Sequence, residues 1–362
     1  MNIKLNIDSI NGSCYSVEYQ LDNHLNERGM NMKKQMIDRI VKATGVTDGE
    51  LILIHFWGED NEIEIMHQFA EAVVAQGATP IELQQSRTHN YHMFSVAKES
   101  CFDEKYMSLF EKIDAVVDVF TYQPVVLGES LAEKQMEMYR SYMGRLFQQL
   151  MSKKRFVQVR VPTAENAKEA ALEPEEYITR MEEAYDIDYE GLKEVCAEKI
   201  EKLQQAEHIF VETGKDCCLK FTVKERSWMA DCGDGDLPCG EVYIAPQENA
   251  TEGNIFFEKL YIEELGKFEK VMFTVKAGKL ICATDVKVQS FLDGLTEQQK
   301  TVCELGFGCN PNIKSLCGYI VLDEKMAETV HFAIGNNVMF GGKNEAEVHM
   351  DFVNEHASYR MG

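Results

Sequence analysis

The sequence lacks the features of a membrane or exported protein. None of its 362 residues belongs to an apolar run of roughly 18 residues, the length that a membrane-spanning helix needs. The first residues, MNIKLNIDSINGS, have neither the apolar core nor the cleavage site of a signal peptide. The 11 cysteines are an odd number without a CxxC pair, which is typical of reduced thiols. We therefore predict a cytoplasmic protein.

Basic residues are also scarce, because 37 Lys and Arg stand against 60 Asp and Glu, which gives a net charge of −23. This charge opposes binding to nucleic acid and to anionic membranes. It favours cationic partners, such as metal ions or substrates with a free amine. No GxGxxG or P-loop sequence follows any strand-like run, so a nucleotide-binding function has no support.

The length exceeds that of a single core and predicts two domains. In the first, which we place at residues 1–206, apolar strand-like runs alternate with amphipathic helical patterns, and residues 174–206 are helical. This alternation predicts an α/β domain with a mostly parallel sheet. The predicted strands are 50–58, 79–85, 113–122 and 154–162, and the helices between them include 61–78 and 130–151.

The pattern changes near residue 207, where short strand-like runs separated by Gly, Asn and Asp replace the longer elements. We predict a β-rich α+β domain at residues 207–362. Near its end, His349 and Asp351 alternate with apolar residues in NEAEVHMDFV. In a strand these side chains point to the same face, whereas on a helix they diverge by roughly 200°. They are either a surface pair or two ligands of one metal.

Three more residues of this domain have the chemistry of metal ligands. His331 lies among apolar neighbours in TVHFAIG, Glu241 follows a glycine turn in LPCGEVYIAP, and Glu304 precedes a glycine-rich turn in CELGFGCNP. Imidazoles with carboxylates form the mixed donor set of Zn, Co or Mn sites. A bridging carboxylate permits two metals, which activate water and polarise a carbonyl for amide hydrolysis. A structural, hydrogen-bonded role remains the alternative for each histidine taken alone.

Four short elements occur in order over the last 120 or so residues: GEVYIAP, ELGFGCNPNI, LDEKMAETVHFAIG and GGKNEAEVHMD. Their order resembles that of the aminopeptidase T family, the thermophilic metalloproteases. This resemblance implies a metal-dependent exopeptidase with two divalent ions per chain and a homodimer with an enclosed active site. It implies small peptides with a free N-terminal amine as substrates, and Glu241 or Glu304 as a metal bridge or general base. The implied ligands are Glu241, Glu304, His331, His349 and Asp351.

The sequence also departs from this family. Val338 stands seven residues after His331, where the family has a tyrosine that is thought to assist catalysis, and Glu328 replaces a glycine. Val338 cannot donate a hydrogen bond or move a proton. Tyr243 and Tyr319 are the candidate replacements.

Two other functions stay open. His331, His349 and Asp351 are the residue types of the facial triad of non-haem Fe(II) oxygenases, and ring-cleaving dihydroxypyridine dioxygenases are similar to this peptidase family. A metal-binding homologue with little turnover is the third interpretation.

Histidines elsewhere have simpler interpretations. We expect His89 and His92, in HNYH, to lie in a solvated loop, and His55 to belong to the core.

Overall fold

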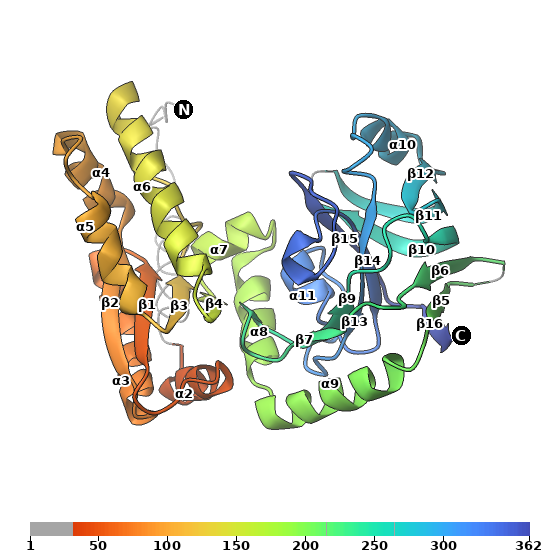
Figure 1. Ribbon diagram of the computed structural model, residues 1–362, viewed down its shortest axis with the longest axis horizontal. Helices are drawn as coiled ribbons and strands as arrows, with labels where there is room; N and C mark the ends of the chain where they lie inside the picture. Colours follow the sequence, from red (N-terminus) through yellow and green to blue (C-terminus); the bar gives the residue numbers. More distant parts are fainter. Residues whose placement is uncertain (1–31, 215, 264) are drawn as a thin grey trace, which may run out of the picture.

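The computed structural model describes residues 32–214, 216–263 and 265–362, so the segment MNIKLNIDSINGS and the start of the predicted first domain lie outside the described residues. Two bodies lie side by side, one around a parallel sheet and one around two antiparallel sheets (Figure 1). No helix within the described ranges is long and apolar enough to cross a membrane.

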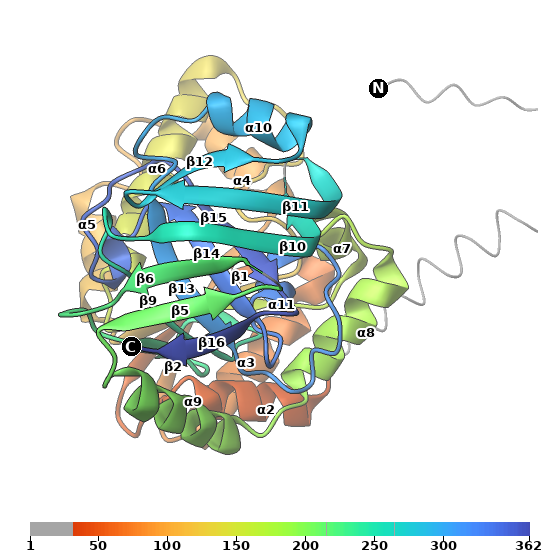
Figure 2. The same cartoon turned by 90° about the vertical axis from the view of Figure 1, so that its right-hand side faces the viewer.

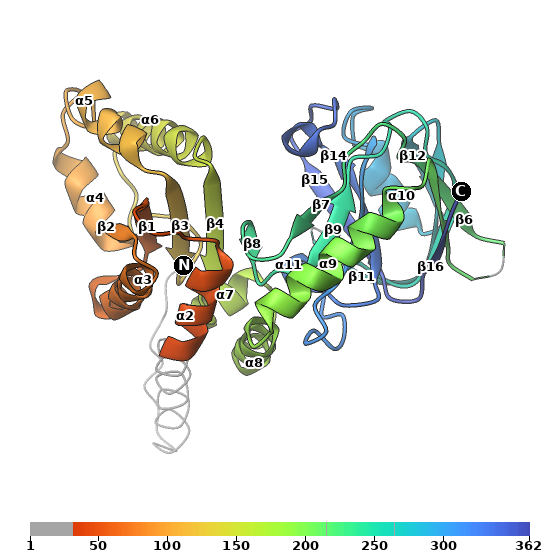
Figure 3. The ribbon, with the colours of Figure 1, turned by 60° about the horizontal axis from the view of Figure 1, so that its bottom comes forward.

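The parallel sheet has the strand order β2-β1-β3-β4-β8, and every neighbouring pair is parallel. Strand β1 (Leu51–Trp57) is apolar on both faces because helices cover the sheet on both sides. Ile52 and Ile54 pack toward α2 and α3, whereas Leu53 and Trp57 pack toward α4 and α6 (Figure 3). The other strands are β2 (Thr79–Gln85), β3 (Ala115–Phe120), β4 (Arg155–Arg160) and β8 (Asp236–Leu237).

Helices connect these strands and lead into the second body, where α9 runs below β7 and β9 (Figure 1). Pro174 begins α8, where a missing N–H has no cost. The helices are α2 (Lys34–Ala43), α3 (Ile63–Ala75), α4 (Arg87–Val96), α5 (Glu104–Met107), α6 (Glu133–Met151), α7 (Ala164–Glu169), α8 (Pro174–Tyr185), α9 (Tyr189–Leu203), α10 (Val286–Asp293) and α11 (Ile320–Asp323). Short 3-10 turns are η1 (Asp60–Glu62), η2 (Ser108–Lys112) and η3 (Val338–Phe340).

The antiparallel body contains two sheets with the orders β12-β11-β10-β6-β5-β16 and β15-β14-β13-β9-β7. The first of these faces the viewer in Figure 2. Its strands are β5 (His208–Glu212), β6 (Cys218–Thr222), β10 (Glu252–Ile262), β11 (Gly266–Lys276), β12 (Lys279–Ala283) and β16 (Ser358–Met361). Those of the second are β7 (Met229–Asp231), β9 (Glu241–Ile244), β13 (Val302–Gly308), β14 (Val330–Gly335) and β15 (His349–Asn354).

This architecture confirms the predicted fold class, a parallel α/β part followed by a β-rich part. After β7, the chain returns to the first sheet as the short strand β8, which pairs with Gln158 and Val159 of β4.

One local prediction was wrong. His89 and His92 lie in helix α4 instead of a loop. The side chain of Ser86 accepts a hydrogen bond from the backbone N–H of His89 and caps the helix, and Phe94 is buried in the core.

Candidate metal centre

Four adjacent strands bring the five predicted site residues together. Glu241 begins β9, Glu304 lies in β13, His331 in β14, and His349 and Asp351 in β15. These strands are consecutive neighbours in one antiparallel sheet. The prediction that His349 and Asp351 share a strand is confirmed, and their side chains approach to 3.4 Å between Nε2 and Oδ2.

Glycines make room for this cluster. Gly306 of β13 pairs with His331, and a Cβ at Gly306 would lie 2.0 Å from the Nε2 atom of the imidazole. Gly240, which precedes Glu241, has φ +129°, and a Cβ there would press against Asn310. Both positions therefore require glycine, one for the space beside the imidazole and one for the entry into β9.

Glu304 lies between the two imidazoles. Its Oε1 is 3.4 Å from His331 Nε2, and its Oε2 is 3.4 Å from His349 Nε2. Glu241 Oε2 approaches the same Nε2 atom of His331, at 3.2 Å. The side chains of Glu241, Glu304 and His331 are 9%, 8% and 0% exposed, so these contacts are shielded from bulk water.

The donor set fits divalent cations. Glu241 Oε2 and Asp351 Oδ1 are buried without a hydrogen-bond partner among the described residues. Such atoms are costly unless they bind a proton donor or a metal. Two donors that each lie about 2.1 Å from a tetrahedral ion are separated by about 3.4 Å. The nitrogen–oxygen distances of 3.2–3.4 Å agree with this separation.

A hydrogen bond orients one imidazole in the manner of metal-binding histidines. His349 Nδ1 donates to the carbonyl oxygen of Asn336 at 2.9 Å, which leaves Nε2 to face Glu304 and Asp351. The thiol of Cys303 lies 3.6 Å from the same Nδ1. The Nδ1 atom of His331 has no hydrogen-bond partner within the described ranges.

The structure adds two residues that the sequence prediction did not assign. The donor atoms form two groups, Glu241 with Glu324 and His331, and Glu304 with His349 and Asp351; within each group they lie within 4.8 Å of one another. Lys325, beside Glu324, is buried and contacts Glu241 directly. Its Nζ also lies 2.7 Å from Glu324 Oε1. The signal was present in the sequence as the pair EK, seven and six residues before His331.

These charges shift one another's pKa values. Burial alone would raise the pKa of Glu241, but the Lys325 ammonium and His331 hold it below the ordinary range. Burial raises the pKa of Glu324 to about 8, against the opposing effect of Lys325. Burial opposes the charged form of His331, but Glu241 and Glu304 raise its pKa well above the usual value. The carboxylates of the site therefore favour the protonated, positively charged form of His331, and burial favours the neutral form of Glu324.

The candidate tyrosines occupy different surroundings. Tyr243 is two residues after Glu241 on β9, so it shares the face of the sheet with this carboxylate, and it pairs with Gly306. Tyr319 instead packs against Tyr177 of α8, with ring centroids 5.8 Å apart. Val338 lies in η3 with a side chain that is 52% exposed. Tyr243 is the phenol that borders the site.

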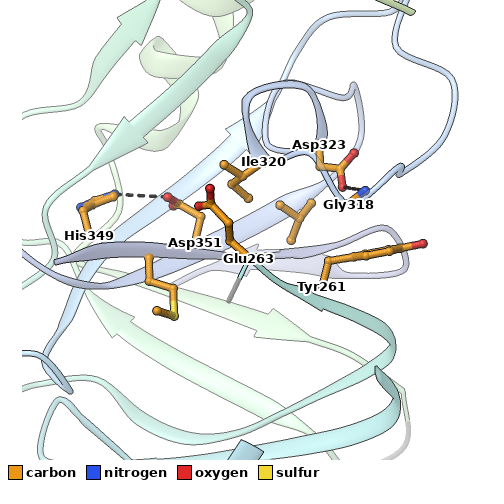
Figure 4. Close-up of a pocket in the computed structure, with 9 residues that line it drawn as sticks. Tyr261, Glu263, Gly318, Ile320, Asp323, His349 and Asp351 are labelled. Carbon is orange, nitrogen blue, oxygen red and sulfur yellow. Dashed lines mark hydrogen bonds and ion pairs between the residues drawn. The ribbon is translucent and has the colours of Figure 1, made fainter. Parts of the chain in front are cut away.

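A cavity of about 60 Å³ lies against His349 and Asp351 (Figure 4). It is bounded by residues of β10 and β15 and by the segment that leads into α11. The lining residues are Tyr261, Glu263, Gly318, Ile320, Asp323, His349, Met350, Asp351 and Val353.

A buried cluster of imidazoles and carboxylates on one sheet is typical of metal-dependent enzymes. The family model of the thermophilic metalloproteases (M29) matches residues 36–357, so the chain belongs to this family. It is a metallopeptidase, a hydrolase that uses divalent metal. The resemblance found in the four sequence elements is thereby confirmed.

Two solved structures share the fold. AmpT from Thermus thermophilus is 17% identical, with a TM-score of 0.63 over 91% of this chain and 97% of that chain. A 2,5-dihydroxypyridine dioxygenase from Pseudomonas putida KT2440 is 13% identical, with a TM-score of 0.60 over 91% of this chain and 93% of that chain. Among proteins of curated function, none matches the sequence.

Proposed function

We propose that the protein is an aminopeptidase that removes N-terminal residues from small peptides at a centre of two divalent ions, with Zn, Co or Mn as the metal. The observation that supports this function best is the position of Glu304 between His331 and His349. The Nε2 atom of each imidazole also faces a second carboxylate, Glu241 at His331 and Asp351 at His349. A carboxylate shared between two such groups is what a two-metal site needs.

The residues present define how the site would work. Glu241, Glu324 and His331 would hold one cation, and Glu304, His349 and Asp351 the other. When bound, these cations supply Lewis acidity that lowers the pKa of water and polarises the peptide carbonyl. Glu304, whose two oxygens face His331 and His349, would be shared between the two groups, and Glu241 or Glu304 would accept a proton from the attacking water. Lys325 fixes one oxygen of Glu241, so the other, Oε2, faces His331.

A dioxygenase is the second candidate function. His331, His349 and Asp351 supply two imidazoles and one carboxylate, the set that non-haem Fe(II) oxygenases use. Three further carboxylates, of Glu241, Glu304 and Glu324, converge on the same centre. An iron site with open coordination positions gains nothing from them, so the hydrolase is the better supported function.

Four further properties belong to the same proposal. The substrates are small peptides with a free N-terminal amine, the protein acts in the cytoplasm, and it assembles as a homodimer. Residues 1–206 form the supporting α/β domain and residues 207–362 the catalytic metal-binding domain. The antiparallel sheet that carries all five predicted ligands supports the last of these.

The deciding measurement is the metal content per chain, by elemental mass spectrometry on protein purified without chelators or a metal-binding tag. Two equivalents of Zn, Mn or Co, with hydrolysis of leucyl peptides after reconstitution with these metals, are expected. One equivalent of iron with oxygen consumption on dihydroxypyridines would instead establish the dioxygenase. Stoichiometric metal without turnover of any peptide would contradict the aminopeptidase and leave a metal-binding homologue.

A further inference from the structure

The cavity beside the candidate metal centre has apolar walls and a carboxylate at its edge. Met350 and Val353 of β15 and Ile320 of α11 contribute apolar surface. Asp351 also lines the cavity, with a side chain that is 9% exposed and an Oδ1 atom without a hydrogen-bond partner in the described part of the chain. A molecule in this cavity therefore touches the metal-binding face directly (Figure 4).

Three carboxylates line this cavity, and two have functions already. Asp323 accepts hydrogen bonds from the backbone N–H groups of Cys317 and Gly318 at 2.8 and 2.7 Å, one on each oxygen. Asp351 belongs to the candidate metal centre. Glu263, directly after β10, is the third, and its side chain is exposed. No residue in the described ranges forms a hydrogen bond or ion pair with it.

The surroundings of Glu263 contain a second acid instead of a compensating cation. The pKa of Glu169, at the end of α7, is raised by burial, and the charge of Glu263 adds to this effect. Arg160 opposes it only in part. The two carboxylates therefore repel each other. A cationic group bound beside Glu263 would relieve this repulsion.

The cavity has room for a small charged group. Its volume of about 60 Å³ is several times the roughly 10–15 Å³ that one water needs, so an ammonium group with its carbon fits this space.

We propose that Glu263 binds the α-ammonium group of the substrate and thereby positions the first peptide bond over the metal centre. This inference rests on the proposed aminopeptidase function and names the residue that recognises the free amine. Glu263 is a carboxylate that reaches the cavity beside His349 and Asp351 without belonging to the ligand set. It would make the enzyme an exopeptidase by favouring substrates whose amine is unblocked.

The test compares ligands with and without the amine on the metal-reconstituted protein. Calorimetry would measure the binding of leucinol and of 4-methylpentan-1-ol, which lacks only the amine; neither has an amide bond to cleave. Hydrolysis of leucyl-p-nitroanilide would give kcat and KM. In Glu263→Gln we expect the preference for leucinol over the alcohol without the amine to fall about tenfold, because a charge-assisted hydrogen bond is lost. In the hydrolysis assay the loss should appear mainly in KM. Glu263→Asp should keep part of the preference.

Glu258→Gln is the matched control, since Glu258 is an exposed acid of β10 that does not line the cavity. An unchanged preference in Glu263→Gln, or none in the wild type, would overturn the inference. So would a loss confined to lysyl and arginyl substrates, which would assign Glu263 to a side chain. A wild type that prefers leucinol but cleaves no peptide would refute the aminopeptidase function, while the assignment of Glu263 to amine binding would still hold.

Discussion

The two bodies each bury a histidine beside a carboxylate, but with different arrangements. In the parallel sheet, His55 Nδ1 lies 2.9 Å from Asp118 Oδ1, and both side chains are fully buried. Asp118 also accepts hydrogen bonds from Trp57 Nε1 at 3.0 Å and from Gln158 Nε2 at 3.2 Å. Here one imidazole meets one carboxylate, and both carboxylate oxygens have partners.

The antiparallel sheet has an excess of acid instead. Two imidazoles and the ammonium of Lys325 face the carboxylates of the two ligand groups, and Glu241 Oε2 and Asp351 Oδ1 are buried without a hydrogen-bond partner among the described residues. Burying charge is costly unless it is paired, so such an excess points to cations from outside the chain. The comparison teaches that burial of a His–carboxylate pair is not itself a sign of function. Among the described residues, buried carboxylate oxygens without a hydrogen-bond partner occur in the metal centre and not at Asp118 of the structural pair.

The largest expected effect follows from removing the shared carboxylate. Glu304→Gln keeps the size of the side chain but takes away the charge that lies between His331 and His349. Losing a group that only orients a ligand costs 10–100-fold, so we expect kcat/KM to fall by more than about 100-fold. Metal at about 100 times its Kd should stabilise the wild type by about 2.7 kcal/mol, and this gain should largely disappear in the variant.

Thermal unfolding with added metal or chelator, together with peptide hydrolysis, measures both effects. The Glu258→Gln protein serves again as the control, because its substitution lies outside the ligand groups. Full activity and an unchanged metal-induced shift in unfolding temperature in Glu304→Gln would show that this carboxylate does not bind metal. The proposed difference between the two sheets would then be wrong.

The second prediction concerns the structural pair. Asp118→Ala removes the acceptor of Trp57 Nε1 and Gln158 Nε2 and leaves these donors without it. Each unsatisfied buried donor costs about 1–3 kcal/mol, and Gln158 is only half-buried, so we expect a loss of about 2–3 kcal/mol in unfolding free energy. Denaturant titration measures this loss. Metal content and KM should stay at the wild-type values, and a parallel loss of metal would show that the two sheets are coupled.

Local sequence patterns predicted those features of the two sheets that lie within a single strand. The alternation of His349 and Asp351 predicted a shared face, and the apolar runs predicted β1, β2, β3 and β4 of the parallel sheet to within about two residues at each end, whereas β8 was not predicted. The five candidate ligands came together only through the resemblance to a family, because spacing does not fix which strands are neighbours.

The contacts between strands could not be predicted from the local sequence. The register that places Gly306 opposite His331 depends on residues 25 positions apart, and no local propensity encodes it. Lys325 was not predicted as a site residue because its role depends on contact with Glu241, which precedes it by 84 positions. The helix around His89 was missed because the cap of Ser86 and the burial of Phe94 outweigh a polar sequence that is typical of loops.

The smallest effect tests whether an ordinary ion pair of the parallel sheet is independent of metal. Glu50 contacts Arg155 at 2.6 Å and accepts a hydrogen bond from the backbone N–H of Thr47. Burial alone would raise the pKa of Glu50, but Arg155 and Thr47 hold it below the usual value. The ionised form therefore stabilises the fold above about pH 4.3, the value in the unfolded chain, and this contribution is lost as the pH falls through the lower folded-state pKa.

Glu50→Gln lacks this contribution, so the wild type should be more stable by about 1 kcal/mol at neutral pH. The gap should close as the pH falls below about 4.3. Denaturant titrations from pH 3 to pH 7, with and without chelator, measure it. Because Glu50 and Arg155 pair one to one, the gap should be the same in both conditions, unlike the change expected for Glu304→Gln. A difference in unfolding free energy that changes with metal would show that the stability of the parallel sheet is coupled to the metal centre. The hydrogen bonding of the carboxylates would then no longer distinguish the two bodies.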